Sequence, residues 1–283
     1  MENNPLLSVL MTAYNREKYI AEAIESVLAS TYKNFELIIV DDCSTDNTFS
    51  IAKKYAANDN RIKLYVNESN LGQFANRNKA ASYASRKYLK FVDSDDIIYP
   101  HSLQIMMDAM LKFPEAGLGF CIKYKDSEKP YPYLINPSEA FLIHYFKGEL
   151  LMIGPGGLII KKEAFENVNC FEEYGMPSDN HLTLKIAGKY PVVALQRDLF
   201  WWRIHAGQVF KLNENNHQNI LNNYLFNTDI LINHSPLNTK ENKLILKNLK
   251  KIFYLNLIRL CFKKGKLAVA YYLYKQYSRI KKI

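Results

Sequence analysis

The sequence predicts an α/β protein whose mostly parallel central sheet carries helices on both faces. Short apolar runs alternate with stretches in which apolar residues recur at helical spacing, and the connections between them are short. The chain has 283 residues, of which 48% are hydrophobic, so it can bury a sizeable core. In sheets of this kind ligands bind at the carboxyl ends of the strands, which makes the residues after each strand the first candidates for function.

Four strands and four helices are expected in the first part of the chain. The strands are the apolar runs at 7–11, 36–40, 62–66 and 88–92. The helices are expected near 19–28, 48–57, 74–85 and 100–113. Side chains at 44–46 can cap the second helix, and Pro100 stands where a first helical turn tolerates proline. The run 36–40 is mostly apolar, as a strand buried on both faces would be.

Polar residues follow each of these strands and should meet at one rim of the sheet. In chain order they are Thr12-Ala13-Tyr14-Asn15, Asp41-Asp42, 67–72 and Asp93-Ser94-Asp95-Asp96. Crowded carboxylates are unfavourable unless a cation or hydrogen-bond donors neutralise them. Asp93 and Asp95 lie on the same side of an extended segment, and such hard oxygen ligands suit Mg²⁺ or Mn²⁺. We therefore expect a divalent metal, basic side chains, or both at this rim.

Each motif alone also has a plain structural interpretation. An aspartate after a strand can cap the next helix or begin an Asx turn. Tyr14 can belong to the core, or its ring can stack on a nucleobase, since it lies in a polar run. The residues alone leave these alternatives open.

Four segments together resemble the family 2 glycosyltransferases, which have the GT-A fold. They are SVLMTAYNRE, ELIIVDDCSTDNT, NLGQFANRNKA and FVDSDD, in this order and at these spacings. The resemblance covers roughly the first 205 residues, so it implies a GT-A catalytic domain over 1–207. Residues 208–283, where helical spacing of apolar residues continues, are expected to form a basic helical extension.

The resemblance implies a role for each rim residue. Thr12, Ala13, Tyr14 and Asn15 would contact the nucleoside, and Asp42, beside Asp41, would meet a uracil ring. Arg77 would lie near the base and the diphosphate. Asp93 and Ser94 would bind the ribose side of the donor, and Asp95 would ligate Mn²⁺ or Mg²⁺, with Asp93 and His205 as further ligands. This pattern favours UDP and leaves dTDP and GDP open.

Three later segments complete the expected site. Gly156 and Gly157 would lie beside the donor sugar and acceptor, or form a plain turn before a strand. Asp179 matches the general base of inverting members, although Ser178 stands where an acid is usual; alternatively, Ser178 caps a helix whose first turn suits Asp179. Arg203 and His205 share one face of a strand and could neutralise the leaving diphosphate or complete the metal shell. Cys43 stands where a glycine is common in the family.

The implied reaction is a single displacement with inversion. Asp179 would remove the proton from an acceptor hydroxyl as that oxygen attacks the anomeric carbon of a nucleotide-diphosphate sugar. The acceptor expected is a glycan or a lipid-linked saccharide, as in the synthesis of bacterial surface polysaccharide. Two alternative functions remain open: that of a haloacid-dehalogenase-like phosphohydrolase, whose Asp-x-Asp usually lies on the first strand, and that of a non-catalytic nucleotide-binding protein.

Charge is concentrated at the C-terminal end of the chain. Residues 241–283 hold twelve Lys or Arg and one acidic residue, a net charge of +11; since the whole chain carries +9, the remainder carries −2. A basic helical segment rich in Tyr, Leu and Phe suits an anionic membrane surface, or is an ordinary solvated face. No nucleic-acid motif accompanies the charge, so no nucleic-acid partner is expected.

The expected location is the cytoplasm, with peripheral attachment to the inner face of the cell membrane. The four cysteines lie far apart without a CxxC pair, which favours reduced thiols. The N-terminal segment has no basic region followed by an apolar run, so a signal peptide is not expected. No run approaches the roughly 20 apolar residues of a membrane span.

Overall fold

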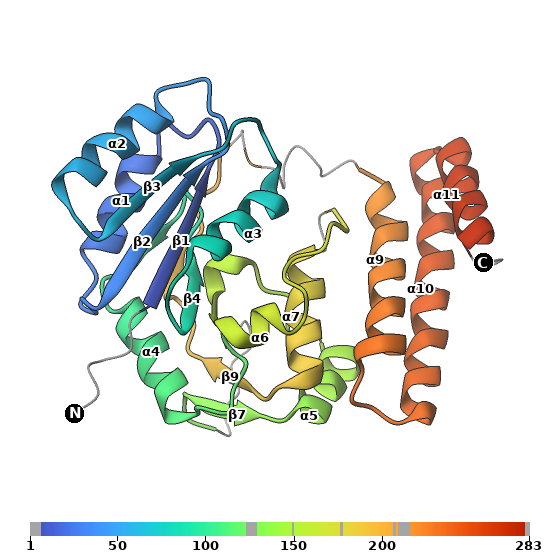
Figure 1. The fold of residues 1–283 in the computed structure, drawn as a ribbon. Coiled ribbons are helices and arrows are strands. Elements are labelled where there is room, and N and C mark those ends of the chain that lie inside the picture. Colours follow the sequence, from blue (N-terminus) through green and yellow to red (C-terminus); the bar gives the residue numbers. More distant parts are fainter. Residues whose placement is uncertain are drawn as a thin grey trace.

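An eight-stranded sheet forms the centre of the catalytic part of the chain (Figure 1). Along the sheet the strands are β3 (Ile62–Val66), β2 (Phe35–Asp41), β1 (Leu7–Ala13), β4 (Tyr88–Phe91), β8 (Leu158–Lys161), β6 (Leu118–Cys121), β9 (Val192–Leu195) and β7 (Tyr133–Ile135). β3, β2, β1 and β4 are mutually parallel, as are β6 and β9, whereas β8 and β7 run antiparallel to their neighbours. The predicted mostly parallel sheet is confirmed.

A computed structural model describes residues 7–122, 129–148, 150–175, 178–205, 208 and 216–280. The expected domain boundary at 207 falls among 206–207 and 209–215, which lie outside these residues, as do the tail residues 281–283.

The four predicted helices are present and cover both faces of the parallel strands. They are α1 (Ile20–Leu28), α2 (Thr48–Asn58), α3 (Gln73–Tyr83) and α4 (Ser102–Lys112). In α1 the buried residues Ile20, Ala23, Ile24 and Val27 form one face, as their spacing of three and four predicts. α1 and α2 pack together on one side of the sheet and α3 packs on the other, against β1 and β2 (Figure 1).

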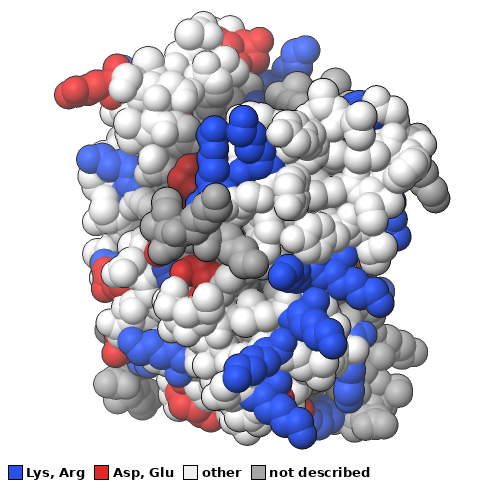
Figure 2. All heavy atoms as spheres, turned by 90° about the vertical axis from the view of Figure 1, so that its right-hand side faces the viewer, with Lys and Arg blue, Asp and Glu red and all other residues white. Residues whose placement is uncertain are grey.

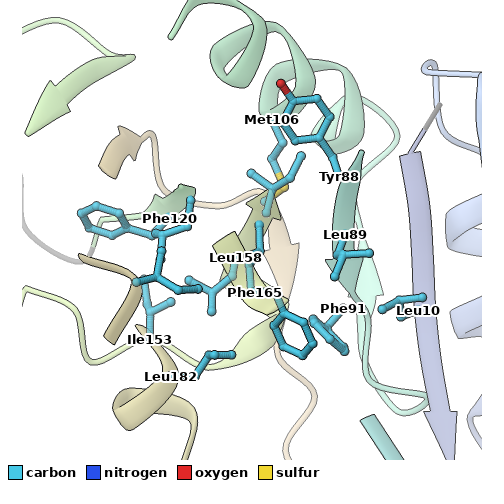
Figure 3. Packing of buried hydrophobic residues seen from close by; sticks show 14 of the residues in the cluster. Leu10, Tyr88, Leu89, Phe91, Met106, Phe120, Ile153, Leu158, Phe165 and Leu182 are labelled. Atoms are coloured by element: carbon cyan, nitrogen blue, oxygen red, sulfur yellow. The ribbon is translucent and has the colours of Figure 1, made fainter. Parts of the chain in front are cut away.

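The second half of the catalytic part returns the chain to the same rim. Its short elements are α5 (Pro137–Leu142), the π-helical turn η1 (Ile143–Lys147), the 3-10 turn η2 (Pro155–Gly157), α6 (Lys162–Glu166) and α7 (Ser178–Lys189). A two-stranded antiparallel pair, β5 (Ile97–Ile98) with β10 (Phe200–Trp201), then lays the 200–205 segment beside the residues that follow β4. The core beneath this rim packs Phe91 of β4 against Phe165, with ring centroids 6.1 Å apart (Figure 3).

Among the described residues of the C-terminal extension, 216–280 contain three α-helices. They are α9 (Gln218–Asp229), which continues into the π-helical turn η3 (Ile230–His234), α10 (Thr239–Lys264) and α11 (Leu267–Ile280). A capping box between Asn238 and Glu241 starts α10, and Gly265 ends it with a φ of 60°. The three helices share a small apolar cluster of their own that includes Leu221, Phe253 and Leu273. None of the helices in the described part of the chain combines the length and apolar character of a membrane span.

Close contact between α7 and η3 fixes the helix that carries Asp179. A side-chain carbon at Gly188 of α7 would overlap the backbone carbonyl oxygen of His234. On the same helix, buried His181 forms a 2.9 Å hydrogen bond between its Nε2 and Oδ2 of Asp229, the last residue of α9. The extension is thereby joined to α7.

Gly188→Ala is expected to lower the free energy of unfolding by about 1–3 kcal/mol, because the gain in helix propensity of about 1 kcal/mol is outweighed by steric overlap. Gly154→Ala is the control, since a side-chain carbon there meets no atom within 4 Å. Chemical denaturation of both variants measures the effect. An unchanged stability for Gly188→Ala would contradict the described packing of α7 on η3.

Candidate active site

Six of the predicted site residues are joined in two small networks at the carboxyl end of the parallel strands. Arg77, on α3, lies between Asp93 after β4 and Asp179 in the first turn of α7. Asp95 after β4 meets His205 from the segment after β10. Residues that are far apart in the sequence, 102 positions in the case of Arg77 and Asp179, thus meet at one rim.

Arg77 is the centre of the first network. Its Nη2 lies 2.7 Å from Oδ1 of Asp93 and its Nη1 lies 3.0 Å from Oδ1 of Asp179. The Arg77 side chain is only 3% exposed, whereas those of Asp93 and Asp179 are 33% and 19% exposed. A buried guanidinium between two carboxylates keeps both charges close together, and removal of either partner would leave an uncompensated charge.

Asp179 has the environment of a carboxyl group that can exchange a proton near neutral pH. Burial raises the pKa of Asp179 to about 6, against the opposing effect of Arg77, and the charge of Asp93 adds to the rise. Ser178 begins α7, but its Oγ accepts a 2.7 Å hydrogen bond from the backbone N–H of Tyr174. Ser178 is thus the first residue of α7, and Asp179 lies in the first turn of this helix, where its negative charge suits the helix dipole.

Asp95 is the centre of the second network. Its Oδ2 accepts a 2.8 Å hydrogen bond from Nε of Arg16 and lies 2.9 Å from Nε2 of His205. Arg203 donates through Nε to the backbone carbonyl of Asp95 at 2.9 Å and forms an ion pair with Glu22 at 2.5 Å. Basic side chains at this rim therefore neutralise the carboxylates, which is one of the two outcomes expected for a crowded acidic edge.

Asp96 connects the 200–205 segment to the rim. Its Oδ1 accepts a 3.0 Å hydrogen bond from the backbone N–H of Arg203. Burial raises the pKa of Asp96 to about 7, with a further contribution from the charge of Asp93. A side-chain carbon added at Gly156 would lie 3.7 Å from Oδ2 of Asp96 and 3.1 Å from the ring of Phe200, and Gly157 is likewise buried beside that ring. The Gly156 backbone therefore lies close to the acidic segment.

Asp41 and Asp42 both hold neighbouring backbone in place. Oδ1 and Oδ2 of Asp41 accept hydrogen bonds from Ser44 N–H and Oγ at 2.9 and 2.6 Å. Asp42 accepts from Asn67 Nδ2 at 2.7 Å and from the backbone N–H groups of Leu71 and Gly72 at 2.9 and 3.0 Å. Asp42 therefore shapes the 67–72 loop that follows β3.

The residues after β1 lie next to this loop system. Ala13 is buried, Thr12 is partly buried, and Tyr14 is 44% exposed, so its ring is accessible for stacking. Oδ1 of Asn15 accepts a 2.9 Å hydrogen bond from Thr45 N–H, and the backbone of Asn15 has a φ of +52°. Cys43 has a φ of +63°, which explains why a glycine is suited to its position. Ser94 is buried.

Sequence reasoning missed two basic residues of this region. Arg16 lies in the segment SVLMTAYNRE without a predicted role, and Lys90 lies within the predicted apolar strand 88–92. Lys90 is fully buried on β4, and its Nζ donates to the Gly156 carbonyl oxygen. Burial lowers its pKa to about 8. The lysine in the middle of the apolar run YLKFV could have indicated this role, because a lysine is rarely buried in a strand unless it has a partner.

The oxygen and nitrogen atoms of the second network suit a divalent metal ion that is bound by the protein and a substrate together. In the part of the chain that the structure describes, no three His, Cys, Asp or Glu residues are grouped so as to hold a metal by themselves. Asp95 and His205 nevertheless present a carboxylate oxygen and an imidazole nitrogen to each other at 2.9 Å. Mg²⁺ in particular commonly binds through one or two protein ligands, with substrate phosphates and water completing its shell. The residues present fit this arrangement.

Asp42→Ala is expected to speed the hydrogen–deuterium exchange of the Leu71 amide, which loses its acceptor, and to speed that of Gly72 less, because the Gly72 N–H also donates to Oδ1 of Asn70 at 3.1 Å. Loss of a hydrogen bond to a charged group raises the equilibrium constant for local opening by roughly tenfold or more. Exchange measured by NMR checks this, with Asp59→Ala on the α2–β3 connection as the control. Equal exchange in wild type and Asp42→Ala would show that Asp42 does not hold the loop.

Comparison with known proteins accords with this site. The family model described as glycosyl transferase family 2 matches residues 8–168, more than half of the chain. The chain is 43% identical over 107 residues to the Escherichia coli UDP-Glc:alpha-D-GlcNAc-diphosphoundecaprenol beta-1,3-glucosyltransferase WfgD, a match that covers 38% of this chain and 42% of WfgD. The chain thus spans less than half the length of curated relatives such as this one.

Solved structures share the fold. Residues 1–349 of Staphylococcus aureus TarS in complex with UDP-GlcNAc align with a TM-score of 0.68 at 21% identity, over 90% of this chain and 73% of that one. The mannosyltransferase PcManGT of Pyrobaculum calidifontis, in complex with GDP-Man and Mn²⁺, aligns with a TM-score of 0.64 at 17% identity, over 100% of this chain and 82% of that one. The expected GT-A fold is confirmed, and the chain belongs to glycosyl transferase family 2.

Proposed function

We propose that the chain transfers a sugar from a UDP-sugar to a hydroxyl of a glycan or lipid-linked acceptor, with inversion, during synthesis of a bacterial surface polysaccharide. One observation carries the proposal: Arg77 holds the Asp179 carboxylate of α7 next to Asp93, at the rim where Asp95 and His205 also lie. A proton acceptor and a cluster suited to a diphosphate therefore share one edge of the sheet.

Asp179 is the proposed general base. Oδ1 of Asp179 is bonded to Arg77, so we assign proton transfer to Oδ2. As the acceptor oxygen forms its bond to the anomeric carbon, its proton passes to Asp179, and the bond between that carbon and the diphosphate oxygen breaks. With one base and no protein nucleophile in the scheme, the configuration at the anomeric carbon inverts. Arg77 keeps Asp179 oriented and lowers its pKa, which favours the ionised form that accepts a proton.

The rest of the rim is proposed to bind the donor. Arg16, Arg77 and Arg203 supply positive charge for the diphosphate, and the exposed Tyr14 ring supplies a stacking surface for the base. A Mn²⁺ or Mg²⁺ ion held by Asp95, with His205 or Asp93, would neutralise the charge that develops on the leaving nucleotide.

The nucleotide and the acceptor are supported by different observations. WfgD carries a name that specifies UDP-glucose and a diphosphoundecaprenol acceptor, and TarS was solved with UDP-GlcNAc, whereas PcManGT was solved with GDP-Man and Mn²⁺. UDP is preferred here because the pattern of Tyr14, Asp42 and Arg77 favours uridine. A lipid-linked acceptor suits a cytoplasmic enzyme that works at the inner face of the membrane. The phosphohydrolase alternative is not favoured, since the family match covers the Asp93-x-Asp95 segment.

Asp179→Asn is expected to lower kcat by about 10²–10⁴-fold while nucleotide-sugar binding remains, because the amide cannot accept the proton. Steady-state transfer assays measure turnover, and isothermal titration calorimetry measures donor binding. Asp198→Asn, an exposed aspartate on the loop before β10, is the matched control. Near-normal turnover in Asp179→Asn would remove Asp179 from the role of base.

The pH dependence of kcat/KM is expected to rise through about pH 6, because Asp179 must be ionised and its pKa lies near 6. Arg77→Met removes the cation that lowers this pKa, so the rise should move to higher pH. Both profiles are measured with saturating divalent metal. An unchanged midpoint in Arg77→Met would contradict the assignment of this titration to Asp179.

A thermal-shift screen of UDP-, dTDP- and GDP-sugars with and without Mn²⁺ tests donor class and metal together. The largest rise in melting temperature is expected for a UDP-sugar with Mn²⁺, and Asp95→Asn should reduce the contribution of the metal. Stabilisation that is equal with chelator and with Mn²⁺ would exclude the proposed metal site.

A further inference from the structure

The outer face of α10 carries a second apolar stripe, separate from the one that packs on the protein. Inward, α10 buries Phe253, Leu257 and Leu260 against α9 and α11, and Ile245 joins the main core of the protein. A helix needs only one such face to dock on its own protein. The outward stripe therefore requires a separate explanation.

The outward stripe repeats at helical spacing. Leu244, Leu255, Ile258 and Phe262 fall within a narrow sector of the helix, opposite the buried residues, because their separations are close to whole turns. They are 50%, 43%, 51% and 85% exposed, respectively. Large apolar side chains in one row on a solvent face mark an interaction surface more often than scattered ones do.

Basic residues lie beside this stripe and, at Lys251, within it. Lys247, Lys251 and Arg259 are exposed on the same side of α10. Figure 2, which looks at this side of the molecule, shows Lys and Arg gathered over its lower half with uncharged surface between them. On α11, exposed Tyr271 and Tyr272 (65% and 57%) lie near Lys275, and tyrosine rings with basic neighbours are typical of membrane interfaces.

Charge selects the occupant of this face. Residues 241–283 carry twelve Lys or Arg and one acidic residue, so a second copy of the chain would bring like charges together along the stripe. Nucleic acid would satisfy the charges but not the apolar row. A bilayer with anionic head groups satisfies both, since its phosphates meet the lysines and its acyl region takes the apolar side chains.

We propose that the outer face of α10, with the tyrosines of α11, docks the protein on an anionic lipid bilayer. Docking on a bilayer would bring the catalytic rim close to the lipid-linked acceptor of the proposed function. Only this purpose of docking rests on the proposed function. α10 is connected through α9 to α7, the helix of Asp179, by the bond between Asp229 and His181. The docked helices would thus hold the catalytic rim at a fixed height above the lipid surface.

The test is co-sedimentation of the full chain with vesicles of phosphatidylglycerol and phosphatidylcholine, compared with vesicles of phosphatidylcholine alone. Wild type should bind the anionic vesicles and lose affinity at high salt. Ile258→Gln/Phe262→Gln should weaken binding about tenfold or more, because both side chains lose their apolar burial. Lys247→Gln/Lys251→Gln/Arg259→Gln should weaken it on the order of 100-fold at low salt.

The matched controls replace exposed lysine and leucine side chains on other faces of the protein. Lys53→Gln/Lys54→Gln on α2 and Leu111→Gln on α4 alter exposed residues and should leave vesicle binding unchanged. Thermal midpoints confirm that every variant is folded, and the shift produced by UDP-sugar reports the active site independently. A chain that binds vesicles but no nucleotide sugar would refute the proposed function and leave this inference standing.

Three outcomes would overturn the membrane assignment. Wild type could fail to bind anionic vesicles, or the α10 variants could bind them as tightly as wild type. Alternatively, sedimentation could show a dimer that Ile258→Gln/Phe262→Gln converts to a monomer without vesicle binding, which would make a second copy the occupant. Binding to DNA or RNA with no binding to vesicles would equally exclude the bilayer.

Discussion

The site depends on one buried cation between two carboxylates. Arg77 is 3% exposed, and its guanidinium spans from Asp93 after β4 to Asp179 on α7. These three residues come from α3, the segment after β4 and the start of α7, so a single side chain joins three separate segments at the rim. Removal of one of these three residues would leave a buried charge unpaired, which is strongly destabilising. The stability of the site therefore requires all three side chains.

The same arrangement sets the proton chemistry of the site. Burial alone would raise the pKa of Asp179 further, and the Arg77 charge limits the rise to about 6. Asp95, by contrast, accepts a hydrogen bond from Arg16 and lies beside His205 and Arg203, so basic side chains surround it. The proposed roles of these two acids on one rim therefore differ: Asp179 would exchange a proton, and Asp95 would bind a cation.

Much of the fold could be predicted from the sequence because a buried face requires apolar residues at the spacing of a helix or a strand. The strands 36–40 and 62–66 and the helix of Ile20, Ala23, Ile24 and Val27 appear where the spacing of apolar residues places them. The convergence of Asp93 and Asp95 with the residues after β1 followed from parallel strand order.

What could not be predicted was which side chains meet, since the partnership of Arg16 with Asp95 and of Lys90 with Gly156 depends on packing between segments far apart in the chain. Asp42 was expected to face a base, and its hydrogen bonds to the 67–72 loop depend on the local path of the backbone.

A crystal structure with Mn²⁺ and a non-transferable UDP-sugar analogue tests the central claim most directly. The account predicts that Asp95 ligates the ion, that the diphosphate lies against Arg16 or Arg203, and that Oδ2 of Asp179 faces the side of the anomeric carbon opposite the nucleotide while Arg77 still holds Oδ1. An analogue bound with its anomeric carbon remote from Asp179, or on another edge of the sheet, would contradict it.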